Sequence, residues 1–204
     1  MTTQQRGEET RQRILEVALE AFARYGYDAT GVAEICRRAG ITKGGFYHHF
    51  PSKQAVFLDL FEQWLGGIDA QLEAVRAEAL TVPQELLGMT AMVRQVFQEA
   101  SGKLPIFFEF LTKATHSQAV WSATAAPLRK YRAFLSEMIA DGRKEGDLRP
   151  VDPDMAANLI LAFAIGLLAI GLLDPTGADW GAAAQQGMDM LLQGLQASSE
   201  PHAA

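Results

Sequence analysis

The chain has 204 residues, 49% hydrophobic and 21% charged, a composition typical of a soluble globular protein with one core, or one core plus a small appended domain. A single cysteine, Cys36, excludes an intramolecular disulfide, and no apolar stretch follows the first charges, so we expect a cytoplasmic protein without a secretory signal. The net charge of −6 argues at first against nucleic-acid binding, but residues 1–53 carry eight Lys and Arg against six Asp and Glu, a net of +2, and residues 54–204 carry ten against eighteen, a net of −8.

Apolar residues recur at helical spacing nearly throughout the chain, with no strand-like alternation and no repeat. This pattern predicts an all-α protein of nine helices, with fraying ends at Met1–Gly7 and Ala197–Ala204. Pro127 should kink or break the seventh helix. The expected helices cover Glu8–Tyr25, Val32–Ala39, Thr42–Phe50, Lys53–Leu80, Pro83–Ser101, a segment with Pro105 in its first turn that ends near Thr115, Ala119–Glu145, Pro153–Leu173 and Asp179–Gln196.

Two short helices joined by Ala39-Gly40-Ile41 have the arrangement of a helix-turn-helix, in which glycine allows the sharp turn. The second should enter a major groove, where Thr42–Gly45, Tyr47 and His48 would meet base edges. Its two glycines each cost about 1 kcal/mol of helix propensity relative to alanine, which indicates that something outside the helix requires them. The mildly basic residues 1–53 are therefore expected to form a DNA-binding head.

The segment Gly40-Ile41-Thr42-Lys43-Gly44-Gly45-Phe46-Tyr47-His48-His49-Phe50-Pro51-Ser52-Lys53 resembles the signature of the tetracycline-repressor (TetR) family. The preceding Ile14-Leu15…Ala18…Phe22…Gly26-Tyr27…Thr30…Val32…Ile35…Ala39 is similar to the rest of that family's head. The resemblance covers about Thr10 to Leu60 and implies a regulator of transcription, most often a repressor. It aligns Lys43, Gly44, Gly45, Tyr47 and His48 with recognition-helix positions, and Thr30, Thr42, His49 and Lys53 with positions that commonly contact the DNA backbone.

Some of these residues have an alternative interpretation. The alternative for Tyr47 is a position in the core, where its hydroxyl would have a hydrogen-bond partner. His48 and His49 suggest a metal, but neighbours on a helix point about 100° apart, and no Cys, Asp or Glu lies nearby in the motif, so neither metal nor cofactor is expected. Cys36 is expected to be a small buried filler.

The fifth to seventh helices are rich in soft, bulky residues, which either fill the core of a bundle or line an apolar pocket. The family resemblance favours a pocket for a small apolar effector, because such repressors hold their inducers there. His116, Glu109, Thr112 and Gln95 are the polar groups that can orient such a ligand. The candidate ligand-binding residues are Met89, Met92, Phe97, Phe107, Phe108, Phe110, Leu111, His116, Trp121, Tyr131, Phe134 and Met138.

The stretch Met155–Leu173 contains nineteen residues, of which Asn158 is the only strongly polar one, and it reaches the length of a membrane span. Flanking acids and the lack of interfacial Trp or Tyr argue against a membrane. A helix that is apolar all round is otherwise buried on every side, which a second copy of the chain can achieve. We expect a homodimer through Met155–Leu173 and Asp179–Gln196, whose two-fold symmetry predicts a palindromic operator in double-stranded DNA.

The sequence thus predicts two domains, a helix-turn-helix domain over residues 1–53 and a ligand-binding and dimerisation domain over residues 54–204. An effector in the second domain would release the first from DNA by a population shift carried by the fourth helix. One rival is a DNA-binding protein of the same fold without an effector. The other is an enzyme, but no catalytic motif is evident, and we expect no catalytic residues.

Overall fold

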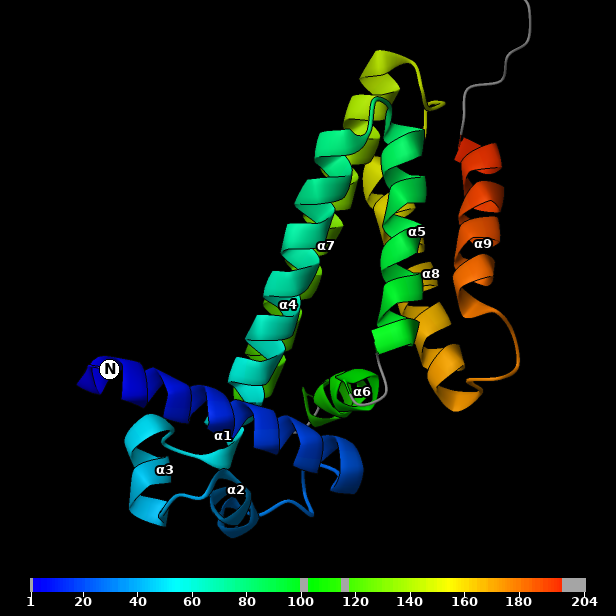
Figure 1. Cartoon of the computed structure of the whole chain (residues 1–204). Helices are drawn as coiled ribbons and strands as arrows, with labels where there is room; N and C mark the ends of the chain where they lie inside the picture. Colours follow the sequence, from blue (N-terminus) through cyan, green and yellow to red (C-terminus); the bar gives the residue numbers. More distant parts are fainter. Residues whose placement is uncertain (1, 100–102, 115–117, 196–204) are drawn as a thin grey trace, which may run out of the picture. The chain divides into compact units, whose positions relative to one another are not determined.

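The computed structural model describes residues 2–99, 103–114 and 118–195, and in these ranges the chain forms nine α-helices and no strand (Figure 1). The predicted all-α class and number of helices are confirmed. The helices are α1 (Thr3–Tyr25), α2 (Val32–Ala39), α3 (Lys43–His49), α4 (Lys53–Glu78), α5 (Val82–Glu99), α6 (Lys103–Ala114), α7 (Gln118–Glu145), α8 (Pro153–Leu173) and α9 (Trp180–Leu195).

Two helix predictions differ clearly from the structure, and the other helix ends lie within two residues of the predicted ones. Helix α1 begins at Thr3 and not at Glu8, because Thr2 and Gln5 form a capping box in which each side chain accepts a hydrogen bond from the other's backbone amide. Helix α7 is continuous through Pro127, so of the two predicted outcomes, a kink or a break, the break is wrong. A proline inside a helix removes one backbone hydrogen bond and costs about 3 kcal/mol, which a helix of 28 residues tolerates here.

The chain folds as two compact units, each formed by two separate stretches of sequence. Unit 1 contains Met1–Gly67 and Ser101–Thr124, and unit 2 contains Ile68–Ala100 and Ala125–Ala204. Unit 1 therefore combines α1, α2, α3 and the first part of α4 with α6, which packs on α1 although it is distant in the sequence. The boundary suggested after residue 53 lies within unit 1.

The core of unit 1 holds the short helices in place. The rings of Phe22, Tyr27 and Phe57 contact one another, with centroids 4.4–5.7 Å apart. Cys36 is buried and unpaired, as predicted for a filler of the core. The other large buried side chains of this core include Ile14, Leu15, Ile35, Phe46, Phe50, Val56 and Phe61.

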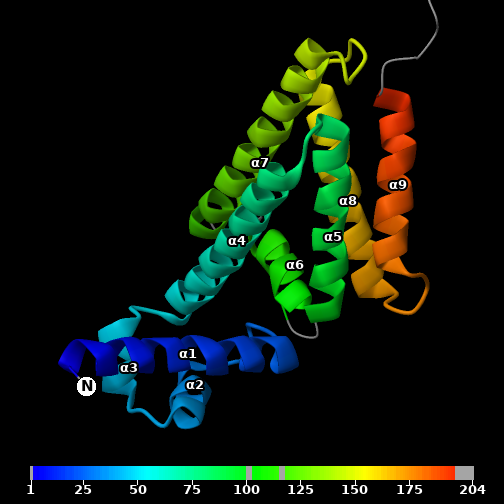
Figure 2. The same cartoon turned by 45° about the horizontal axis from the view of Figure 1, so that its top comes forward.

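In unit 2, α5, α8 and α9 lie side by side, as both views show (Figure 2). Their shared core also takes in residues of α7. Gly171 of α8 lets the ring of Phe97 approach so closely that a Cβ at this position would collide with it. The central buried residues are Leu86, Leu135, Met138, Ile139, Ala157, Ile160, Met188 and Leu192.

Candidate nucleic-acid interface

Helix α3 is a seven-residue rod whose two ends are fixed by backbone and side-chain hydrogen bonds. Gly40 ends α2 in the left-handed conformation (φ 67°), and the following amide of Ile41 donates to the Cys36 carbonyl at 3.0 Å. The hydroxyl of Thr42 then caps α3 by accepting from the Gly45 amide at 3.1 Å. The turn between the two helices is thus built from local contacts that the sequence already indicated.

One side of α3 is anchored in the core and the other is exposed. Phe46 and Phe50 are buried, whereas Lys43, Tyr47 and His48 are exposed. Tyr47 is 54% exposed, which excludes the alternative that it is a core residue. Lys43 and Tyr47 stand four residues apart and therefore share one helix face.

The two glycines of α3 are not required by packing within the chain. A Cβ at Gly44 would meet only the hydroxyl oxygen of Thr42, at 3.8 Å, and a Cβ at Gly45 would lie 3.5 Å from the same atom. Both are ordinary contact distances, so alanine would fit at either position. This agrees with the expectation that a molecule outside the chain approaches the backbone here.

The neighbouring histidines lie edge to face, with ring centroids 5.1 Å apart. In the ranges that the structure describes, no group of three His, Cys, Asp or Glu side chains is placed to hold a metal ion. The exposed His48 and the half-buried His49 remain candidates for DNA contact.

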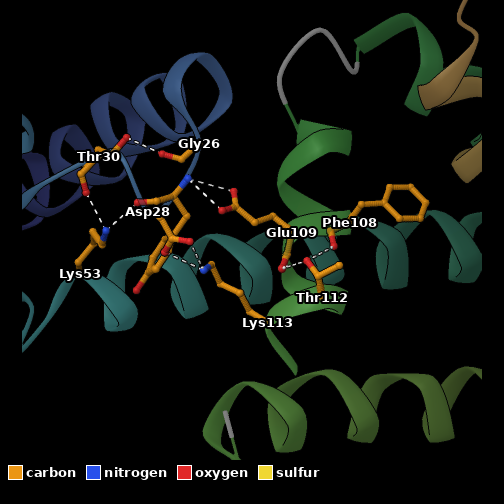
Figure 3. A network of polar contacts seen from close by, with 9 residues as sticks. Gly26, Asp28, Thr30, Lys53, Phe108, Glu109, Thr112 and Lys113 are labelled. Carbon is orange, nitrogen blue, oxygen red and sulfur yellow. Dashed lines mark hydrogen bonds and ion pairs between the residues drawn. The ribbon is translucent and has the colours of Figure 1, made fainter. Parts of the chain in front are cut away.

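Thr30 lies inside the head and not on its surface (Figure 3). It is 1% exposed, and its hydroxyl donates to the Gly26 carbonyl at 2.8 Å and to the Ala21 carbonyl at 3.2 Å. The interpretation of its side chain as a contact to phosphate therefore needs correction. The hydroxyl ties the end of α1 to the start of α2, a role that depends on tertiary packing.

Lys53 is likewise directed toward the chain itself. Its ammonium donates to the carbonyls of Tyr27 (2.6 Å) and Thr30 (2.8 Å) and lies 4.1 Å from the centre of the Tyr27 ring. Partial burial lowers the pKa of Lys53. Two of its three N–H donors are thus used by the α1–α2 loop, leaving one for a phosphate.

A second set of polar contacts joins the same loop to α6 (Figure 3). Both carboxylate oxygens of Glu109 accept from the Tyr27 amide, at 3.1 and 3.0 Å. Lys113 forms an ion pair with Asp28 at 2.8 Å, and this hydrogen bond holds the pKa of Asp28 below its ordinary value. We call Glu109, Lys113, Tyr27 and Asp28 the α6 latch. Sequence reasoning missed it because its partners are more than 80 residues apart.

The buried position of Thr30 gives a direct test. Replacing Thr30 by valine, which has nearly the same shape, should lower the free energy of unfolding by about 1–2 kcal/mol, because the hydroxyl's hydrogen bonds are lost. Thermal unfolding followed by circular dichroism measures this. The DNA affinity of the folded variant should stay unchanged. A large loss of DNA affinity without a loss of stability would instead support a direct contact between Thr30 and phosphate.

The candidate ligand-binding residues are divided between the two units. In unit 1, Phe108 and Leu111 are half-buried and Trp121 is 47% exposed. Phe107 and Phe110 lie on α6, but their side chains are outside the described set, as is all of His116. In unit 2 the candidates are Met89, Met92, Phe97, Tyr131, Phe134 and Met138.

Several of the unit 2 candidates have a clear packing role. Met138 is 1% exposed and lies in the core, against which Met89 and Phe134 pack. Phe97 lies against Trp180, with ring centroids 6.4 Å apart. Tyr131 donates to Asp69 at 3.0 Å, and burial raises the pKa of its hydroxyl. These contacts agree with the alternative in which bulky residues fill the core.

Three of the four polar groups expected to orient a ligand have partners within their own units, and the fourth, His116, lies outside the described residues. Gln95 accepts from Gln71 at 2.8 Å, and the Thr112 hydroxyl donates to backbone carbonyls of its own helix. Glu109 belongs to the α6 latch.

Known proteins resemble the chain along most of its length. The family model "Bacterial regulatory proteins, tetR family" matches residues 14–60, and the model "BetI-type transcriptional repressor, C-terminal" matches residues 87–196. The A-factor receptor protein of Streptomyces griseus is 27% identical over 180 residues, which cover 88% of this chain and 61% of that protein. This chain thus matches less than two thirds of that relative's length.

Two solved structures share the fold. A protein from Saccharomonospora viridis crystallised with choline has a TM-score of 0.80 at 20% identity, covering 94% of this chain and 100% of that one. The transcriptional regulator FadR from Bacillus subtilis, in complex with stearoyl-CoA, has a TM-score of 0.74 at 18% identity, covering 90% and 98% of the two chains. At these identities the likeness establishes the fold alone.

Proposed function

Because this chain belongs to the TetR family of bacterial regulatory proteins and is a DNA-binding transcriptional regulator rather than an enzyme, we propose that it is a cytoplasmic repressor that a small apolar effector releases from a palindromic operator. The observation that carries the DNA-binding part is the exposed face of α3, with Lys43 and Tyr47 outward and Phe46 and Phe50 buried behind it. A short rod held from one side and open on the other can enter a major groove.

In this proposal the start of α3 reads bases. Lys43 donates to guanine acceptors or phosphate, Gly44 and Gly45 let the backbone approach, and Tyr47 and His48 contact base edges or the backbone. The phosphate contacts come from Thr42, from His49 and from the remaining donor of Lys53. Thr30 does not contact DNA itself and contributes only by holding the α1–α2 loop in position.

The dimer rests on the uncovered apolar residues of α8 and α9. Helix α8 is the one helix in the described ranges that is long and apolar enough to cross a membrane, and only 33% of its most apolar window is buried within the chain. An acid caps its start, since the Asp152 carboxylate accepts from the amides of Asp154 and Met155. A second copy of the chain supplies the cover that such a face needs in water. The large apolar side chains of α8 and α9 that are exposed are Met155 (68%), Leu159 (51%), Ile170 (54%), Leu173 (85%) and Met190 (71%).

The effector is proposed to be apolar because α5 to α7 carry many bulky apolar residues, among them Met and Phe. The stearoyl-CoA held by the FadR structure supports an effector with a long apolar part. The core positions of Met89, Phe134 and Met138 favour the second candidate function, a regulator of the same fold without an effector. Native mass spectrometry of the purified protein separates the two, since a copurified small molecule is expected only for the first.

Effector release is proposed to be a population shift between two arrangements of the heads, carried by α4, which continues from unit 1 into unit 2. The α6 latch supports a second mechanical link, from α6 to the helix-turn-helix, because Glu109 and Lys113 of α6 hold the loop that precedes α2. An effector acts only through its different affinity for the two arrangements.

The latch can be tested without the effector. Replacing Glu109 by alanine removes a charged acceptor from the Tyr27 amide, a hydrogen bond worth about 1.5–3 kcal/mol, so amide exchange in the α1–α2 loop should rise about 10- to 150-fold. Hydrogen–deuterium exchange read on a peptide spanning Gly26–Thr30 measures this. Glu137→Ala, at an exposed position of α7, is the matched control. Equal protection in both variants would show that the latch does not hold the loop.

Selection of duplexes from a random-sequence pool, followed by footprinting, tests the whole proposal. Enrichment of an inverted repeat is the expected result. A pool that stays random after several rounds at moderate salt would contradict sequence-specific binding.

A further inference from the structure

Cations on the exposed side of α2 share a single carboxylate. Arg37 donates from Nε and Nη2 to the two oxygens of Glu34, at 2.9 and 2.7 Å, and Arg38 donates from Nε to one of them at 2.7 Å. Arg38 also donates to the Tyr25 hydroxyl at 3.1 Å, and its guanidinium lies 5.3 Å from the centre of that ring. We call Glu34, Arg37 and Arg38 the arginine cluster of α2.

The cluster is accessible to solvent and permanently charged. The side chain of Arg37 is 69% exposed, that of Glu34 33% and that of Arg38 22%. Hydrogen bonds from Arg37 and Arg38 lower the pKa of Glu34 to about 2, so its carboxylate stays ionised at neutral pH. Exposed ion pairs of this kind contribute little to folding stability. Their larger effect is therefore expected on the binding of a charged partner.

A DNA phosphate would use the same donors. The planar guanidinium fork binds carboxylate and phosphate in the same bidentate geometry. Helix α2 is the first helix of the helix-turn-helix, and such a helix crosses the DNA backbone when the second lies in the major groove. Glu34 therefore occupies donors that lie on the helix nearest to the phosphates.

Resting on the proposed DNA binding of this head, we propose that Glu34 is an internal counterion that withholds Arg37 and Arg38 from DNA phosphates and so limits sequence-independent binding. The head has a net charge of only +2, and one carboxylate is a large share of that balance. Phosphate contacts carry no sequence information, so restraining them lowers the affinity for every DNA sequence by the same factor and keeps sequence-independent binding weak.

Glu34→Gln tests this, because it removes the charge and keeps the size. Binding to a random-sequence duplex, measured by fluorescence anisotropy, should become tighter. Each phosphate contact changes the slope of log K against log salt by about −0.9, so between about 200 and 50 mM salt the gain over wild type should grow about 3.5-fold if one arginine engages a phosphate and about 12-fold if both do. The operator should gain by the same factor.

Two controls isolate the arginines. Glu20→Gln removes the same charge from an exposed position of α1 and should leave the salt dependence unchanged. Arg37→Gln with Arg38→Gln should cost little in the wild type, where Glu34 occupies both side chains, and should abolish the gain of Glu34→Gln. If Glu34→Gln does not fold, Glu34→Asp is the second variant, because it keeps the charge but has a shorter side chain. Its DNA affinity should rise less than expected for Glu34→Gln, in the same direction.

An unchanged affinity and salt slope in Glu34→Gln would overturn the counterion role while wild-type operator binding stands. A gain that survives removal of both arginines would overturn it too, since the carboxylate would then act through its own charge. Failure of the wild type to select any operator would instead count against the proposed function.

Discussion

Replacing Lys43 by alanine is expected to weaken operator binding by about 1–3 kcal/mol, or about 5- to 150-fold, because an amine at the start of the recognition helix loses its base or phosphate partner. Tyr47→Ala, four residues later on the same exposed face, should have an effect of similar size. Fluorescence anisotropy with the selected operator, at one fixed salt concentration, measures both losses.

The matched control for Lys43→Ala is Lys144→Ala. Lys144 is also an exposed lysine, but it lies in unit 2 and pairs with Asp141 at 2.8 Å. Its removal should leave operator affinity unchanged, and size-exclusion chromatography should show the same oligomeric state for all three variants. Full-strength operator binding by Lys43→Ala and Tyr47→Ala would mean that α3 is not the reading helix.

The second large effect is expected from the exposed face of α8. Placing aspartate at both Leu159 and Ile170 would bury two charges in the proposed interface, so the variant should be monomeric. Losing the linked second half-site should lower operator affinity by about 10²- to 10⁴-fold. Light scattering after size exclusion gives the mass, and anisotropy gives the affinity.

Leu80→Asp is the control for this variant. Leu80 is 89% exposed in the turn between α4 and α5, so it tests an aspartate at an exposed leucine outside α8 and α9. It should leave the mass and the operator affinity unchanged. A wild-type chain that is monomeric at micromolar concentration, or an unchanged dimer in the double variant, would refute the proposed interface.

Sequence reasoning located the helix-turn-helix because its boundaries are encoded locally. Helix α2 has the predicted bounds, since Gly31 precedes it and Gly40 ends it in a left-handed conformation. Helix α3 begins one residue later than predicted, because Thr42 is its cap and not its first residue. The exposure of Tyr47 and burial of Phe46 follow from the same short pattern.

The roles of Thr30 and Lys53 were not predictable in the same way. Both side chains are polar and flank the motif, yet they donate to carbonyls of the chain itself. These acceptors are brought near by packing between α1, α2 and α4, and no spacing rule reports that packing. The same reason hid the α6 latch, in which Glu109 and Lys113 reach residues 82 and 85 positions away.

The core of unit 2 shows a different limit of sequence reasoning. A methionine that fills a core and one that lines an apolar pocket have the same chemistry and recur at the same helical spacing. Met138 is buried in the same core as Leu86 and Ile139. The composition of α7 does not distinguish this packing position from a contact to a ligand. Only the packing partners separate these assignments.

The sparse cover that α8 receives from its own chain has a consequence for gene control. If two chains must meet before the face is covered, the amount of active regulator rises with roughly the square of free chain concentration while monomers predominate. Operator occupancy would then respond to changes in synthesis with a threshold, and a small drop in gene dosage would release the target genes more sharply than a regulator acting as a single chain allows.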